Sequence, residues 1–336
     1  MRGKGLVGRR IIKTGISVFI TALICILLKL PPEFAVIAAI VTIEPTASDS
    51  IRKGLVRFPA SAIGAGFAVL FVFLFGPSAT SFTLAAIFTI LLCQKLKLYD
   101  GILVATLTAV AMVPDIQDHH HVLTFLSRLG TTFIGITVSS LVNFFILPPK
   151  FSPIIKEKLV PNLQLAGKVL VDTIETIINM KQTKADAPSE DYLKLRQSTE
   201  KISELVSFQE KEWKYHRIKL SEYRNFNKLR KTNLISQKIV LHLGNLQYVK
   251  EPGSFTTAEK ELVMEAVFSI KAILASPTFD IDNRHYELAN ELDQLLKEEA
   301  NLKQASNQYF HHFTPKRIVY FQLLSIHDCL EELQST

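Results

Sequence analysis

Two carboxylates in the first half of the chain stand where an apolar segment meets a proline. Glu44 is followed by Pro45, and Asp115 is preceded by Pro114. A carboxylate that faces a cavity and is partly desolvated holds a proton more readily, so it can couple proton movement to the movement of another solute. The same acid can instead meet water at a helix end. The residue types leave both interpretations open.

Two arginines offer the complementary charge. Arg57 begins the apolar segment 57–77, and Arg128 begins the segment 128–148. An arginine at the end of a membrane helix can snorkel as an anchor or attract anions to the mouth of a path. Thr42 and Thr108 can line such a path, although a threonine hydroxyl also bonds back to its own helix. These eight residues are the candidate path for substrate or protons.

The arginines occupy matching places in an internal repeat. Residues 57–77 and 128–148 align without a gap at an offset of 71. Each segment is long enough to cross the hydrocarbon core of a bilayer. The Arg, Gly and Pro matches carry the signal, because apolar residues match by composition alone. The six identities are Arg57/Arg128, Ile63/Ile134, Gly64/Gly135, Leu70/Leu141, Phe73/Phe144 and Pro77/Pro148.

The apolar pattern predicts an all-α membrane protein with six transmembrane helices. An offset of 71 maps the first three apolar segments onto the last three, and an odd number of spans turns the second copy upside down. We therefore expect a 3+3 inverted repeat, with repeats at about 11–77 and 82–148. Segments 34–45 and 101–115 are short and end at proline, a pattern that marks the substrate path in such repeats. The apolar segments are 11–28, 33–47, 55–75, 82–98, 101–114 and 127–147.

Charge predicts the orientation and the partners. With a cytoplasmic N-terminus, eleven Lys and Arg residues of the first 150 face the cytoplasm and only Lys29 and Arg128 face out. We expect a multi-pass protein of the cell membrane with both termini cytoplasmic. The net charge of +7 lies entirely in residues 1–150, so its partner is membrane lipid and not nucleic acid.

The second half of the chain has a different pattern. Residues 151–336 hold 25 Lys and Arg against 25 Asp and Glu, with apolar residues at helical spacing. We assign 1–150 to a six-span transmembrane domain and 151–336 to a cytoplasmic α-helical domain, a bundle of five or six helices with a bend near residue 232. Thr256 and Glu259 have the spacing of a capping box.

No pattern of a catalytic, cofactor or metal site is found. Cys25, Cys93 and Cys329 lack CxxC spacing, and the chain has no phosphate-binding glycine loop, HExxH or GxSxG motif. The consecutive histidines at 119–121 cannot all face one point on a helix, so a solvated loop is expected in place of a metal site. We expect no cofactor and no enzyme activity.

Three stretches resemble the aromatic acid exporter family of Gram-positive bacteria. They are TIEPTASDSIRKG at 42–54, the R-x6-G pattern from Arg57 to Gly64, and VNFFILPP at 142–149. That family lies in the fusaric-acid-resistance group, which also resembles plant aluminium-activated malate channels. The resemblance implies a six-span, homodimeric protein of the bacterial cell membrane that exports or conducts small organic anions. The chain departs from these relatives because its second and fifth segments lack the basic residues that line their path.

Two hypotheses follow. The first is a transporter or channel that exports small organic, possibly aromatic, carboxylates, driven by protons or membrane potential. The alternative is a membrane-anchored scaffold or sensor whose cytosolic bundle binds a protein partner.

Overall fold

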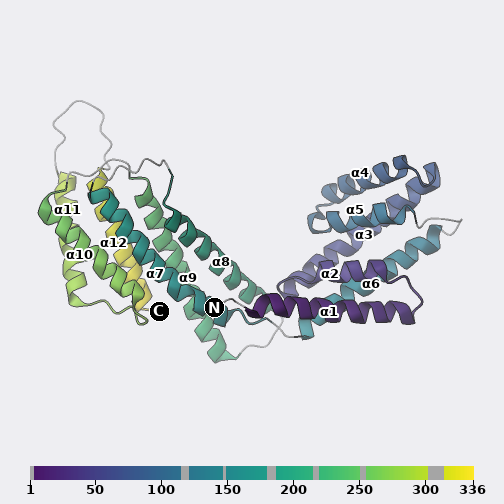
Figure 1. The fold of residues 1–336 in the computed structure, drawn as a ribbon, viewed down its shortest axis with the longest axis horizontal. Coiled ribbons are helices and arrows are strands. Elements are labelled where there is room, and N and C mark those ends of the chain that lie inside the picture. The colour runs from purple at the N-terminus through teal and green to yellow at the C-terminus, as the bar shows by residue number, and fades with distance from the viewer. Residues whose placement is uncertain are drawn as a thin grey trace. The chain divides into compact units, whose positions relative to one another are not determined.

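The computed structural model describes residues 4–114, 121–146, 149–179, 187–214, 219–249, 255–301 and 314–336. Within these residues the chain forms twelve α-helices and one short 3-10 turn, with no strand (Figure 1). It divides into two compact units. One contains residues 1–149 and 210–217, and the other contains 150–209 and 218–336.

Six helices make up most of the first unit, and each predicted apolar segment overlaps one of them. Three are long and apolar enough to cross a membrane: α1 from residue 10 on, α3, and α6 from residue 122 on. α2, α4 and α5 are shorter apolar helices. The bounds are α1 Lys4–Leu27, α2 Glu33–Thr42, α3 Ala47–Phe75, α4 Ala79–Lys95, α5 Ile102–Met112 and α6 His121–Phe145, with the 3-10 turn η1 at Tyr99–Gly101.

α3 begins eight residues before the predicted apolar segment. The hydroxyl of Thr46 accepts the backbone N–H of Asp49, which caps the helix N-terminus. The polar first turns of α3 are therefore helical although their composition is not apolar. A helix boundary follows the capping residue, whereas the apolar pattern shows only which part of the helix is buried in lipid or protein.

The first unit is built from two groups of three packed helices. In each group, the longest helix comes from the other half of the sequence repeat. α3 packs with α4 and α5, α6 packs with α1 and α2, and α3 also contacts α6 (Figure 1). Gly64 of α3 lies directly against the backbone of Ala105 in α5, and Gly135 of α6 lies against Ala35 in α2. Glycine removes the side chain that would hold these backbones apart.

A second internal match lies at the C-terminal ends of α1 and α4, the first helix of each set of three apolar segments. Residues 25–30 read CILLKL and residues 93–98 read CQKLKL. In both stretches the lysine has a positive φ, 56° at Lys29 and 58° at Lys97. The amide of the last residue donates to the carbonyl of the cysteine at 2.9 Å in both. The chain thus uses the same Schellman C-cap twice.

The second unit is a helical bundle around one apolar core. Leu163, Ala166 and Leu170 lie in this core as their spacing predicted, and the predicted capping box of Thr256 and Glu259 is formed. The bounds are α7 Ser152–Ile178, α8 Glu190–Glu212, α9 Leu220–Gln247, α10 Thr257–Ala275, α11 Asn283–Asn301 and α12 Pro315–Gln334.

The bend predicted near residue 232 is wrong. α9 is continuous from Leu220 to Gln247, and the interruption between α8 and α9 falls at residues 213–219. No glycine or proline occurs from 220 to 243, so nothing in the backbone chemistry of that stretch stops a helix.

One histidine pair lies inside the bundle. His285 is 2% exposed; its Nδ1 is 2.9 Å from the hydroxyl of Ser269 and its Nε2 is 3.1 Å from Nδ1 of His327. Burial and the neighbouring His327 lower the pKa of His285 to about 4. The folded bundle therefore holds this imidazole in its neutral form.

We expect the two contact glycines to be intolerant of substitution. A Cβ at Gly64 or Gly135 overlaps a backbone carbonyl, so G64A and G135A should each destabilise the protein by about 1–3 kcal/mol. G66A is the matched control, because no atom lies within 4 Å of a Cβ built there. The measurement is the temperature at which detergent-solubilised protein aggregates. Equal values for G64A and G66A would contradict the close helix contact.

Acid should weaken the bundle through His285. Between pH 6.5 and about 4 the unfolded chain binds a proton that the folded chain excludes, so the free energy of unfolding falls as the pH falls. At pH 4 the loss is on the order of 3 kcal/mol. Thermal unfolding followed by circular dichroism should show this slope in the wild type and a shallower one in H285Q. Parallel slopes for the two proteins would show that His285 is not responsible.

Candidate functional site

The chain between α2 and α3 is extended, and side chains hold its backbone. α2 ends at Thr42, and the segment 43–46 precedes α3. Nδ2 of Asn143, on α6, donates to the carbonyls of Glu44 at 3.0 Å and Thr46 at 3.1 Å. The hydroxyl of Ser50 donates to the carbonyl of Thr42 at 2.9 Å. Carbonyls released by the broken helix therefore find partners inside the protein, as an apolar environment requires.

Asn143 is itself fixed by a lysine. Nζ of Lys13, on α1, donates to Oδ1 of Asn143 at 2.7 Å and to its carbonyl at 3.3 Å. Lys13 is 5% exposed and Asn143 is fully buried. One amide therefore connects α1, α6 and the extended segment. Neither residue was among the sequence candidates, because a single Asn or Lys in an apolar pattern has no distinctive spacing.

Arg57 and Glu44 form a buried ion pair. Nη2 of Arg57 is 2.8 Å from Oε1 of Glu44, and Nζ of Lys53 is 3.2 Å from Oε2 of the same carboxylate. Arg57 also donates to the carbonyls of Val41 at 2.9 Å and Asp100 at 3.2 Å, and it is 8% exposed. The two cations and one carboxylate leave a formal charge of +1 at the end of α2, which attracts anions.

Arg128 lies at a second site with a different partner. Its guanidinium carbon is 3.0 Å from the centroid of the Phe34 ring, and Nη2 donates to the hydroxyl of Thr108 at 3.2 Å. The residue is 7% exposed. A cation over an aromatic face is stabilised by the ring quadrupole, so Phe34 helps to orient the guanidinium.

Arg128 lines a pocket of about 630 Å³. Its lining combines the guanidinium, the side chain of Glu33 and several hydroxyl residues with apolar side chains. Such a lining fits a small molecule that has one anionic group and an apolar body. The lining residues are Pro31, Glu33, Phe34, Ala111, Met112, Leu123, Thr124, Ser127, Arg128 and Thr131.

A line of hydroxyls leads from Arg128 into the contact of α3 and α6. The hydroxyl of Thr108 is 3.1 Å from that of Ser61, and the Ser61 hydroxyl is 3.5 Å from that of Thr132. Ser61 lies one turn beyond Arg57 on α3, and the three hydroxyl residues are at most 2% exposed. Polar groups therefore extend from Arg128 to Ser61 at the contact of α3 and α6, one helical turn along α3 from Arg57.

Ser61 and Thr132 were missed from the sequence, although a signal existed. They are 71 residues apart, so the repeat that pairs Arg57 with Arg128 also pairs these two positions. The two positions are not identical, because one is serine and the other is threonine. Both residues nevertheless supply a hydroxyl.

The remaining candidates lie outside this line. The hydroxyl of Thr42 donates to the carbonyl of Ala38 at 2.7 Å, so it bonds back to its own helix. Pro45 is half-buried in the extended segment, and Pro114 is exposed beyond the end of α5. Asp115 lies outside the described residues, as do His119 and His120. Under the offset of 71 Asp115 matches Glu44, and this equivalence stays a prediction.

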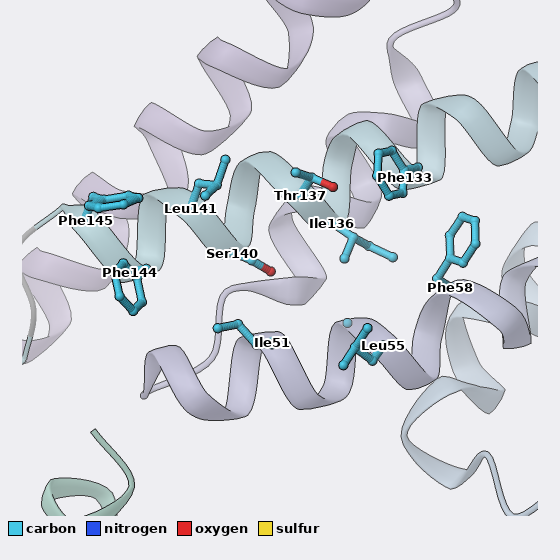
Figure 2. A pocket seen from close by; sticks show the side chains of 11 residues that line it. Ile51, Leu55, Phe58, Phe133, Ile136, Thr137, Ser140, Leu141, Phe144 and Phe145 are labelled. Carbon is cyan, nitrogen blue, oxygen red and sulfur yellow. The ribbon is translucent and has the colours of Figure 1, made fainter. Parts of the chain in front are cut away.

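An apolar groove of about 450 Å³ lies between side chains of α3 and α6 (Figure 2). Figure 2 shows side chains from the two helices facing one another across it, with hydroxyls only at Thr137 and Ser140. No charged residue lines the groove, so it is unsuited to an anionic group. Its lining residues are Ile51, Gly54, Leu55, Phe58, Phe133, Ile136, Thr137, Ser140, Leu141, Phe144 and Phe145. Within the described part of the chain, no three His, Cys, Asp or Glu side chains come together as a metal site.

Comparisons with known proteins agree with the resemblance seen in the sequence. Residues 6–146 match the family described as Aromatic acid exporter family member 1. A UPF0421 protein of Bacillus cereus is 45% identical over 332 residues, which cover 98% of this chain and 94% of that protein.

Two further relatives extend the group. A UPF0421 protein of Halalkalibacterium halodurans is 36% identical over 98% of this chain and 89% of its own length. One from Staphylococcus aureus is 39% identical over 82% of this chain and 84% of its own length. The chain therefore belongs to the aromatic acid exporter family, within the group formed by the UPF0421 proteins.

Proposed function

We propose that the first unit exports small organic carboxylates across the bacterial cell membrane. The observation that carries this proposal is the pair of buried arginines, Arg57 and Arg128, inside an apolar helical unit, with hydroxyls that extend from Arg128 to Ser61. Buried charges inside membrane segments are costly and mark ion pathways. Membership of an exporter family supports a transporter in preference to an enzyme.

The proposed membrane arrangement has six spans in two inverted repeats, with both termini cytoplasmic. The exchange of α3 and α6 between the two helix groups supports it, because the contact of Gly64 with α5 is repeated by Gly135 with α2. The excess of Lys and Arg on one side supports the orientation. A domain of residues 151–336 on the cytoplasmic side and a homodimer are part of the same proposal.

The two arginine sites have distinct roles in the proposed path. Glu44 supplies a carboxylate to Arg57 where a substrate carboxylate would otherwise bind, so the cluster is closed while the ion pair persists. Separation of this ion pair frees Arg57 to bind the anion. At Arg128 the guanidinium faces a pocket that can hold an acid before release. An inside-negative membrane potential favours anion export by about 2.3 kcal/mol per charge per 100 mV.

Arg128 should be essential for export. R128Q removes the charge at the pocket, and loss of a charged hydrogen bond corresponds to about a tenfold or greater fall in efflux. Efflux of radiolabelled 4-hydroxybenzoate from preloaded cells measures it, at equal protein level in the membrane. K95Q is the control, because Lys95 is an exposed cation at the end of α4. Efflux by R128Q at the wild-type rate would contradict the proposed path.

Glu44 should restrain export through its ion pair with Arg57. E44Q removes the negative charge that holds the guanidinium, so the substituted protein should export faster than the wild type. The measurement is the initial rate of radiolabelled 4-hydroxybenzoate efflux from membrane vesicles with the membrane potential clamped. A wild-type rate in E44Q would remove the carboxylate from the mechanism.

A further inference from the structure

The last turn of α8 belongs to the first unit. Residues 210–217 group with residues 1–149, whereas the earlier part of α8 belongs to the second unit. Lys211 and Glu212 are the final two residues of this helix. They bring one cation and one carboxylate to the start of α3.

The carboxylate of Glu212 occupies the N-terminus of α3. Oε2 accepts the backbone N–H of Ala47, the first residue of α3, at 2.9 Å. This N–H is one of the first-turn donors that have no partner within the helix. Glu212 is only 2% exposed. A buried carboxylate at the positive end of a helix is a strong contact, because the helix dipole and a charged hydrogen bond act together.

Lys211 contacts the same turn from the side. Its Nζ is 3.2 Å from Oδ2 and 3.3 Å from Oδ1 of Asp49. Asp49 is 6% exposed, and its Oδ2 accepts the hydroxyl of the capping residue Thr46 at 3.0 Å. Lys211 and Glu212 therefore hold both the cap and the first backbone donor of α3.

The turn that they hold is joined directly to the arginine cluster. Ala47 follows Glu44 by three residues, and the carbonyls of Glu44 and Thr46 share one donor, Asn143. A movement of the Glu44 backbone away from Arg57 shifts this short segment. That shift pulls the first turn of α3 away from its partners in α8.

We propose that Lys211 and Glu212 form an autoinhibitory latch that keeps the Glu44–Arg57 cluster closed by holding the first turn of α3. Export then requires release of the latch, so the rest of α8 can regulate the path through chain connectivity. This inference rests on the proposed function, because it assigns regulation to the same cluster.

Breaking the latch should increase export. E212Q keeps the shape of the side chain and removes its charge, and K211M removes the ion pair with Asp49 while leaving Glu212. Each is expected to raise the initial rate of 4-hydroxybenzoate efflux by about fivefold or more, the effect of a typical coupling between sites. E204Q makes the same change two turns earlier on α8, at an exposed position, and should leave the rate unchanged.

Two outcomes would overturn the latch. Wild-type rates in both E212Q and K211M would show that these contacts do not restrain export. Lower rates at equal membrane abundance would show that they support the exporting state. Testing two residues separately guards against a single variant that fails to fold.

A second readout separates the latch from the proposed function. Thr42 is 1% exposed, so T42C, in a chain whose three cysteines are changed to alanine, reports opening at the end of α2. A membrane-impermeant maleimide should label it faster in inside-out vesicles when E212Q is added. Faster labelling without any efflux would support the latch and contradict export of the acid tested. Efflux by the wild type, with E212Q changing neither its rate nor the labelling, would contradict the latch alone.

Discussion

A buried arginine needs partners, and the first unit is arranged around that requirement at Arg57. One guanidinium receives a carboxylate from Glu44 and two backbone carbonyls, from Val41 and Asp100. Those carbonyls are available only because α2 stops at Thr42 and a 3-10 turn precedes α5. The break in α2 and the charge on Arg57 therefore depend on each other. The break leaves backbone carbonyls without partners in the helix, and the guanidinium donates hydrogen bonds to them while they stabilise its charge.

The two arginines of the repeat reach different solutions to this problem. Arg57 is held by a carboxylate and by carbonyls, so its charge is largely compensated. Arg128 lies over the Phe34 ring and donates to a threonine hydroxyl. A duplicated sequence thus gives its two matching arginines different neighbours.

Close backbone contacts surround the two arginine sites. Gly64 and Gly135 bring α3 and α6 against α5 and α2, and at the separate contact of α3 with α6 Ser61 lies beside Thr132. Hydroxyls at such a contact can satisfy one another's hydrogen bonds within the apolar interior. The apolar groove between α3 and α6 lies outside this line, because its lining offers no partner for an anionic group (Figure 2).

The amino-acid sequence by itself determined where the helices lie and which charged residues stand in apolar segments. Apolar run length located the six helices of the first unit, and the R-x6-G register located both arginines and both contact glycines, because these features are local. Only the tertiary structure decided the partners. It joined Glu44 to Arg57, exchanged α3 and α6 between the helix groups, brought Ser61, Thr132 and Asn143 into the site, and turned Thr42 back onto its own helix. The reason is physical: hydrogen bonds and ion pairs between segments depend on which helix faces pack together, and such long-range contacts leave no regular spacing in one sequence.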